Sequence, residues 1–154
     1  SLFSNAELKC NLDNILKIKS EGISGKRVFE TNCSSCHRKG DSGNNIGPDL
    51  SKIDQKLDKV GLFEAITRPS SSLVFGYETF TLSTKSGDSF YGFILSENDK
   101  NITIKDLAGK QHSILKKDIL KKEMDKNSIM PDAASFQFSH QEIADLLTYL
   151  TLKN

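Results

Sequence analysis

Hydrophobic residues recur at the helical period in four stretches of the chain. Residues 139–152 give the clearest pattern, because Ser139 and Glu142 form a capping-box pair directly before a regular apolar stripe. That stripe consists of Ile143, Leu146, Leu147 and Leu150. Three further amphipathic helices are predicted, at residues 4–19, 25–36 and 58–67.

An N-terminal cap is predicted for the first of these three helices, and apolar faces are predicted for the first and the third. Ser4 with Glu7 fits a second capping box at the start of the first helix. The apolar face of that helix consists of Leu8, Leu12, Ile15 and Leu16. The apolar face of the third consists of Val60, Phe63 and Ile66.

Between residues 76 and 120 the pattern changes to short segments separated by Gly, Asp and Asn, which predicts strands and turns. Four strands are expected at 77–84, 89–97, 101–106 and 111–116, with a weaker fifth at 118–120. We therefore predict a mainly α fold with a small inserted antiparallel β-meander. The meander is expected to have an aromatic core of its own, rather than an aromatic ligand surface, made of Tyr77, Phe80, Phe90, Tyr91 and Phe93.

Composition narrows the class of protein. The chain has 154 residues, 36% of them hydrophobic, and no apolar run long enough to span a bilayer, so we expect no transmembrane segment here. A net charge of +1 gives no field that would hold nucleic acid, which is excluded as an expected partner. Lysines dominate residues 100–126; a solvated surface is the favoured interpretation, with an acidic partner as the alternative.

The strongest chemical signal is the run Cys33-Ser34-Ser35-Cys36-His37, the pattern of c-type haem attachment. Residues three apart share one helix face, so Cys33 and Cys36 are placed to form thioethers with the two haem vinyl groups. His37 then faces inward as an iron ligand. We predict one covalent haem c per chain.

Two other interpretations of the cysteine pair are weaker. A zinc site needs two more ligands at close spacing, whereas Cys10, His112 and His140 are isolated from one another. A dithiol redox motif should follow a strand, but a helical pattern leads into this one. Haem attachment is therefore the favoured interpretation.

The remaining iron chemistry is assigned from two downstream motifs. A ligating imidazole needs a partner for its second ring nitrogen, and the carbonyl of Pro48, in Gly47-Pro48-Asp49-Leu50, is the candidate. Met130 is the favoured sixth ligand, because Pro131 holds it in an extended loop. Met124, His112 and His140 remain alternatives. An apolar wall around the haem is predicted from Leu50, Ile53, Leu57, Phe63 and Ile66.

With these motifs the sequence resembles a class I cytochrome c carrying a β insertion. More narrowly, it is similar to the haem-binding domain at the C-terminus of large secreted, dehydrogenase-like proteins of planctomycetes and Verrucomicrobia. Besides the haem motif, the resemblance rests on Gly25, Phe29, Gly47-Pro48-Asp49-Leu50, Arg68-Pro69-Ser70-Ser71, Gly76-Tyr77-Glu78, Thr84-Lys85-Ser86-Gly87, Gly92-Phe93-Ile94, Ser128-Ile129-Met130-Pro131 and the segment from Glu142 to Leu150.

The resemblance implies a cytochrome c fold around the covalent haem, with His37 and Met130 as ligands. It also implies that Gly25, Phe29 and Tyr149 pack where the first and last cytochrome helices cross. Residues 22–154 would form the cytochrome domain, with the β insertion at about 76–120. Residues 1–21 would be a helix or linker from a preceding domain, with Cys10 as a free or interface thiol.

The expected function is electron transfer rather than enzymatic catalysis. Single electrons would pass from a dehydrogenase partner or domain to a cytochrome or respiratory acceptor, outside the cytoplasm in the bacterial periplasm or an equivalent compartment. A haem enzyme or gas sensor with an open or displaceable sixth ligand is the alternative. A protein-docking role for the β insertion is a further hypothesis.

Overall fold

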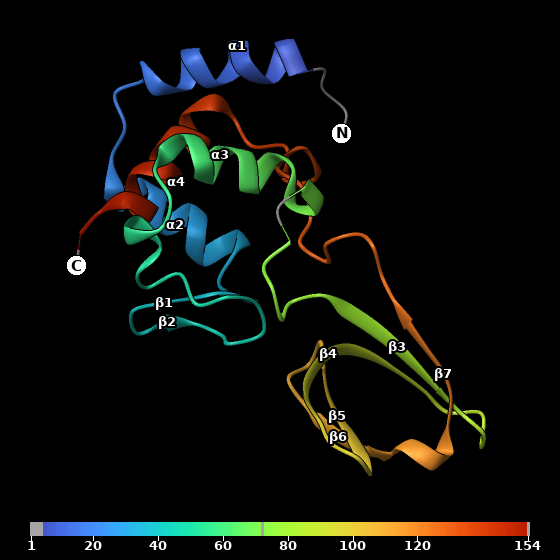
Figure 1. Cartoon of the computed structure of the whole chain (residues 1–154). Helices are drawn as coiled ribbons and strands as arrows, with labels where there is room; N and C mark the ends of the chain where they lie inside the picture. The colour runs from blue at the N-terminus through green and yellow to red at the C-terminus, as the bar shows by residue number, and fades with distance from the viewer. Residues whose placement is uncertain (1–4, 72, 154) are drawn as a thin grey trace. The chain divides into compact units, whose positions relative to one another are not determined.

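The computed structural model describes residues 5–71 and 73–153, and the chain forms two compact units (Figure 1). The helical unit combines Ser1–Ser72 with Pro131–Asn154, and the β unit is the continuous segment Leu73–Met130. The cap predicted at Ser4 and the side chains of Leu8 and Cys10 lie outside the described residues. Helices hold 36% and strands 25% of the residues, so the prediction of a mainly α chain is not confirmed.

The described residues of the helical unit contain four α-helices. They are α1 (Asn5–Leu16), α2 (Gly22–Asn32), α3 (Lys59–Thr67) and α4 (His140–Thr151). Each corresponds to a predicted amphipathic stretch. In the part of the chain that the structure describes, no helix is both long and apolar enough to cross a membrane.

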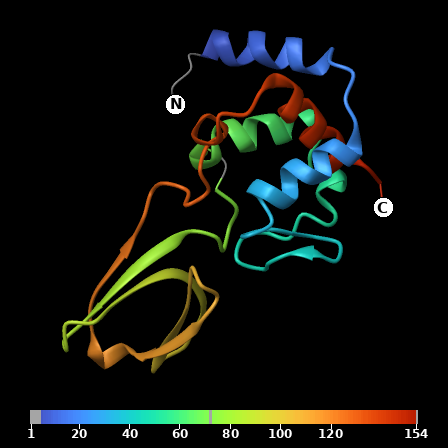
Figure 2. The same ribbon diagram turned by 180° about the vertical axis from the view of Figure 1, so that it is seen from behind.

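Helices α2 and α4 cross and pack against each other, and Figure 2 shows this pair from behind. A Cβ added at Gly25 would lie 1.9 Å from the carbonyl oxygen of Asp145, so only glycine permits this approach. Phe29 is fully buried beside the crossing, and its ring centroid lies 5.6 Å from that of Tyr149. The expected packing of Gly25, Phe29 and Tyr149 is confirmed.

Helix α4 agrees with its prediction in detail. The Ser139 hydroxyl accepts a hydrogen bond from the Glu142 N–H, and the Glu142 carboxylate accepts one from the Ser139 N–H. This reciprocal capping box satisfies two N–H groups that the first helical turn leaves without partners. All four predicted apolar residues of the helix, Ile143, Leu146, Leu147 and Leu150, are buried.

Two details of the other helices differ from prediction. In α3 the Asp58 carboxylate caps the helix and Leu62 is buried, whereas Val60 is exposed, so the apolar face is turned from the one expected. Helix α2 begins at Gly22 and ends at Asn32, so the haem-type motif follows the helix instead of lying within it. The loop after the motif contains the short hairpin β1 (Arg38–Lys39) and β2 (Ser42–Gly43).

The β unit is one antiparallel sheet of five strands. They are β3 (Thr79–Thr84), β4 (Ser89–Glu97), β5 (Asn101–Asp106), β6 (Gln111–Leu115) and β7 (Ile119–Met124). Their order in the sheet is β6-β5-β4-β3-β7. The four main predicted strands are confirmed, and the weaker fifth becomes a full strand that pairs with the first.

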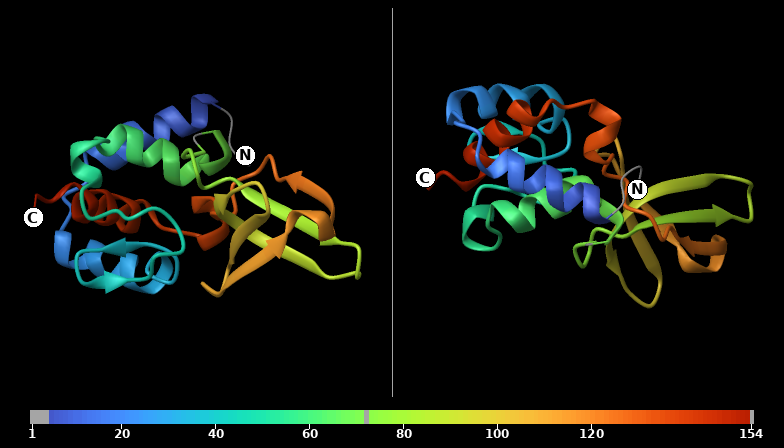
Figure 3. Two further views of the ribbon diagram at one scale, coloured as in Figure 1. Left: turned by 60° about the horizontal axis from the view of Figure 1, so that its bottom comes forward. Right: turned by 90° about the horizontal axis from the view of Figure 1, so that it is seen from above.

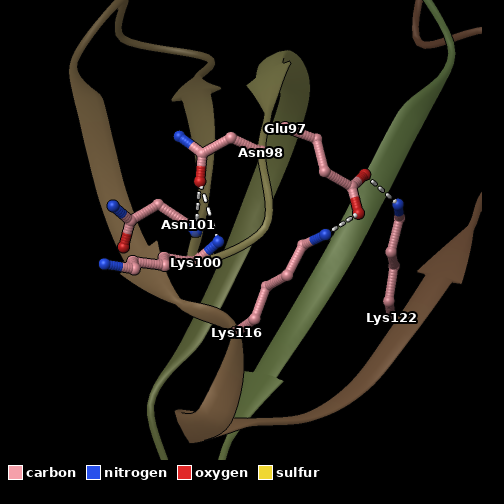
Figure 4. A network of polar contacts seen from close by, with 6 residues as sticks. All are labelled: Glu97, Asn98, Lys100, Asn101, Lys116 and Lys122. Carbon is pink, nitrogen blue, oxygen red and sulfur yellow. Dashed lines mark hydrogen bonds and ion pairs between the residues drawn. The ribbon is translucent and has the colours of Figure 1, made fainter.

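This sheet is coiled rather than a flat meander, as both views in Figure 3 show. Leu82 pairs with Phe90 on one side and with Lys122 on the other, so Phe90 and Lys122 lie level. Glu97 is seven positions beyond Phe90 along β4, which on a flat sheet is about 23 Å. Lys122 Nζ nevertheless lies 2.8 Å from Glu97 Oε2 (Figure 4). The sheet must therefore curl until the end of β4 meets β7.

The core of the β unit is mainly aliphatic. Its buried cluster consists of Leu82, Ile102, Ile104 and Ile114, with Phe90, Ile94 and Ile119 packed against it. Of the aromatic residues predicted to form the core, Phe93 is buried and makes a T-shaped contact with the Tyr77 ring, while Phe80 and Tyr91 are only half-buried. The expected aromatic core is therefore only partly correct.

Candidate functional site

The two cysteines and the histidine of the motif lie in a tight turn directly after α2. The N–H of Cys33 donates to the carbonyl of Phe29 at 2.8 Å, which closes the helix. The N–H groups of Cys36 and His37 then both donate to the Cys33 carbonyl, at 3.1 and 2.9 Å. The turn keeps the compact spacing expected of a helix and brings all three side chains to one end of α2.

The following loop folds back and binds the carbonyls of this turn. The N–H of Asn44 donates to Ser34 at 2.9 Å, and the N–H groups of Ile46 and Gly47 donate to Cys36 at 3.0 and 2.7 Å. Gly43 makes the return possible: its φ is +95°, and a Cβ there would lie 2.0 Å from the His37 carbonyl oxygen. Sequence analysis missed this role, although the glycine-rich loop was its signal.

The orientation of His37 is fixed by the carbonyl predicted for it. Nδ1 of His37 lies 2.8 Å from the Pro48 carbonyl oxygen, and because a carbonyl only accepts, Nδ1 carries the proton. Nε2 is then left as the nitrogen with a free lone pair for a metal. A Cβ on Gly47 would lie 2.8 Å from the imidazole Cε1, so Gly47 forms a cradle against the ring.

Cys33 and Cys36 are free thiols in different surroundings. Cys33 is half-buried, and burial, with a smaller contribution from the nearby Cys36, raises its pKa to about 11. Cys36 is exposed. Both remain available for thioether formation, and with an imidazole held one residue away the donor set fits covalent haem c. Within the described residues no cluster of three or more His, Cys, Asp or Glu side chains could hold a metal ion.

The residues predicted to form the apolar wall around the haem differ in solvent exposure. Phe63 and Ile66 are buried, Leu50 and Ile53 are half-buried, and Leu57 is 36% exposed. Leu50 is tied to the loop, because its N–H donates to the Arg38 carbonyl at 2.7 Å. Their role as a haem wall stays a prediction.

The four candidates for the sixth iron ligand differ in exposure and in hydrogen-bond partners. Met130, half-buried, ends the β unit, and its N–H donates to Ser128 Oγ at 3.2 Å. Met124 lies on β7 with 56% of its surface exposed. His112 already has a partner, since its Nε2 lies 2.8 Å from the Asp106 carboxylate. His140 is the exposed first residue of α4. Ligation by Met130 stays a prediction.

A helix followed by two free thiols and an imidazole held by a backbone carbonyl defines an attachment site for haem c. Comparison with known families agrees, because the Cytochrome c family model matches residues 23–100, about half of the chain. The chain therefore belongs to the cytochrome c family and is a haem-binding electron-transfer domain that carries covalent haem c with its iron. No curated protein matches the chain.

Proposed function

We propose that this domain is an outer-sphere electron carrier with one haem, ligated by His37 and Met130. The observation that carries the proposal is the hydrogen bond from His37 Nδ1 to the Pro48 carbonyl, because it presents Nε2 as a fixed, basic ligand. When bound, the haem supplies an iron that exchanges one electron between its ferrous and ferric states.

The residues of the chain set the conditions for that exchange. Cys33 and Cys36 anchor the group, and the Pro48 carbonyl holds the imidazole in one tautomer and orientation. Met130 would raise the reduction potential, since a thioether favours the ferrous state. Leu50, Ile53 and Phe63 would limit the access of water, which keeps the local dielectric low.

The partners proposed for this domain are redox proteins. A dehydrogenase, as a separate protein or a preceding domain, would donate single electrons, and a cytochrome or other respiratory protein would accept them. The resemblance to haem domains at the C-terminus of large secreted planctomycete-type proteins supports this arrangement. Because that family is secreted, we propose an extracytoplasmic, periplasmic location.

Absorption spectroscopy of the exported protein tests both ligation and function. We expect low-spin spectra in both oxidation states, a reversible one-electron reduction, and little reaction with carbon monoxide. Met130→Ala should lower the reduction potential and open the ferrous iron to carbon monoxide. Met124→Ala is the matched control, because Met124 is the other methionine and lies exposed on β7. Rapid carbon monoxide binding by the unaltered protein would instead favour an open-site haem enzyme or gas sensor.

A further inference from the structure

A buried lysine lies two residues after the proposed iron ligand. Lys39, on β1, is only 5% exposed, and among the described residues its Nζ has no hydrogen-bond partner. Nζ lies 5.4 Å from the centroid of the Tyr149 ring, over the face of that ring. Within the described part of the chain, this contact with an aromatic ring is the interaction that the ammonium group makes.

Stability alone does not explain a lysine at this position. Moving an ammonium group out of water is costly unless it is paired and hydrogen-bonded, and a cation–π contact returns only part of that cost. A methionine of similar length would fill the same space without a charge to desolvate. The Lys39 ammonium therefore makes the helical unit less stable than an apolar side chain would.

The position of Lys39 suggests what the charge does. Its Cα lies within about 7 Å of the His37 Cα, because two peptide units span no more than that. Its aromatic partner Tyr149 packs on Phe29 at the crossing of α2 and α4, so the charge lies in the interior of the unit that carries His37. Charges act more strongly there than at the surface, because the surrounding medium screens them less.

We propose that Lys39 raises the reduction potential of the haem by placing a fixed positive charge in the interior beside His37. This inference rests on the proposed function. Reduction adds one electron from a redox partner to the ferric centre and removes one positive charge from it. A neighbouring cation favours that change. Tyr149 holds the ammonium in place.

Four variants test the proposal. Lys39→Met removes the charge and keeps most of the volume, and Lys39→Gln is a second neutral variant if the first fails to fold. Lys39→Arg keeps the charge. Lys26→Met is the matched control, because Lys26 is an exposed residue of α2 that only approaches Glu30, at 3.7 Å. The reduction potential and the unfolding temperature are measured for each haem-loaded protein.

The proposal expects opposite effects on the two measurements. Both neutral variants at position 39 should have a lower potential than the unaltered protein, with a shift larger than that of Lys26→Met, while Lys39→Arg should retain most of the potential. Lys39→Met should unfold at a higher temperature. A potential unchanged relative to the control, or a lower unfolding temperature for Lys39→Met, overturns the inference. If the unaltered protein shows no reversible one-electron reduction, the proposed function fails first and this inference fails with it.

Discussion

At the scale of single residues, the two cysteines of the attachment turn should differ in reactivity. The Cys33 thiol is half-buried, with its pKa raised from 9.0 to about 11, whereas the Cys36 thiol faces solvent. The thiolate is the reactive form, so burial protects Cys33 both by access and by suppressing ionisation. We expect haem-free protein at pH 8 to be alkylated first at Cys36, as measured by mass spectrometry of timed digests.

The pH dependence of that protection follows from the direction of the Cys33 shift. Folding favours the neutral thiol, so this contribution to stability is fully present below pH 9 and is lost as the pH rises toward 11. Cys33 labelling should therefore accelerate steeply across this range. In urea the two cysteines should react alike. Equal rates without denaturant would contradict the different environments described for them.

At the scale of single residues, prediction from sequence was strongest where a chemical motif fixes the spacing between residues. The attachment motif at residues 33–37 and the Pro48 carbonyl as the partner of His37 were both identified from sequence, because a covalent motif and a ligating imidazole restrict the residues around them, although the motif was expected within a helix. Lys39 was not identified. In sequence it begins a polar, glycine-rich loop, and its burial depends on Tyr149, which lies 110 positions later. No local pattern carries that information.

At the scale of elements, the crossing of α2 and α4 depends on one missing side chain. Alanine at position 25 would place its Cβ against backbone atoms of Asp145, which cannot move aside as a side chain can. We expect Gly25→Ala to lower the free energy of unfolding of the helical unit by about 3 kcal/mol or more, because the two helices must separate. Denaturant unfolding followed by circular dichroism measures the change.

Gly61→Ala provides the matched control for this substitution. Gly61 also lies within a helix, but the nearest atom to its added Cβ belongs to the flexible Leu57 side chain, at 3.1 Å. The higher helix propensity of alanine offsets that contact, so stability should stay within about 1 kcal/mol of the original. A similar loss for both variants would show that backbone conformation, rather than the crossing, decides the effect.

Element boundaries were harder to predict than the elements themselves. Residues 25–36 were expected to be one helix, yet α2 stops at Asn32. The N–H of Ser34 donates to the Phe29 carbonyl instead of the Glu30 carbonyl, which ends the helical hydrogen-bond pattern. The loop at Asn44 and Gly47 then binds the carbonyls of Ser34 and Cys36, so the shape of the turn depends on residues beyond the helix. The start of α4 was predicted correctly because its capping box is local.

At the scale of the whole molecule, two ion pairs to one carboxylate hold the coiled sheet of the β unit. We call this group of Glu97, Lys116 and Lys122 the Glu97 clasp. Glu97 accepts from Lys116 and Lys122, both at 2.8 Å, and these hydrogen bonds lower its pKa to about 2 (Figure 4). Because its pKa is lowered from 4.5, the stabilising contribution is present above pH 4.5 and is lost as the pH falls toward 2.

Acid titration of the β unit checks the clasp. We expect the unfolding temperature of this unit to fall between pH 4.5 and 2, and the fall to be smaller in Glu97→Gln. Both lysines belong to the basic stretch predicted from sequence, so part of its charge is neutralised within the fold. Identical pH profiles for the two proteins would assign the acid sensitivity to other carboxylates.

The strands of this sheet were predictable, but their coiling was not. Alternation and turn residues locate β3 to β6, because those signals are local. The pairing of β7 with β3 joins residues about forty positions apart in the sequence, and the bend of β4 includes a register shift between Ile94 and Ser96. The coiling depends on core contacts and on ion pairs to Glu97 that join residues far apart in the sequence, and a short window of sequence does not contain both partners of such a contact.

The β unit should fold without the rest of the chain. A segment of this size is marginal on its own, since about 60-residue domains bury only about 60% of their unfolded surface. Residues 73–130, however, are continuous and contain a complete aliphatic core and the Glu97 clasp. We expect the isolated segment to give a β-type circular dichroism spectrum and to unfold cooperatively without haem.

Leu82→Ala gives this prediction a sharp control. Leu82 is fully buried at the centre of the aliphatic core, so truncation should cost about 2–5 kcal/mol and abolish cooperative unfolding of so small a unit. Leu120→Ala, at a position 70% exposed on β7, should change little. An unfolded wild-type segment would show that the sheet depends on the helical unit. A folded wild-type segment would show that the sheet and the helical unit with the haem site fold independently. Substitutions on the surface of the sheet could then accumulate without disturbing the fold that holds His37.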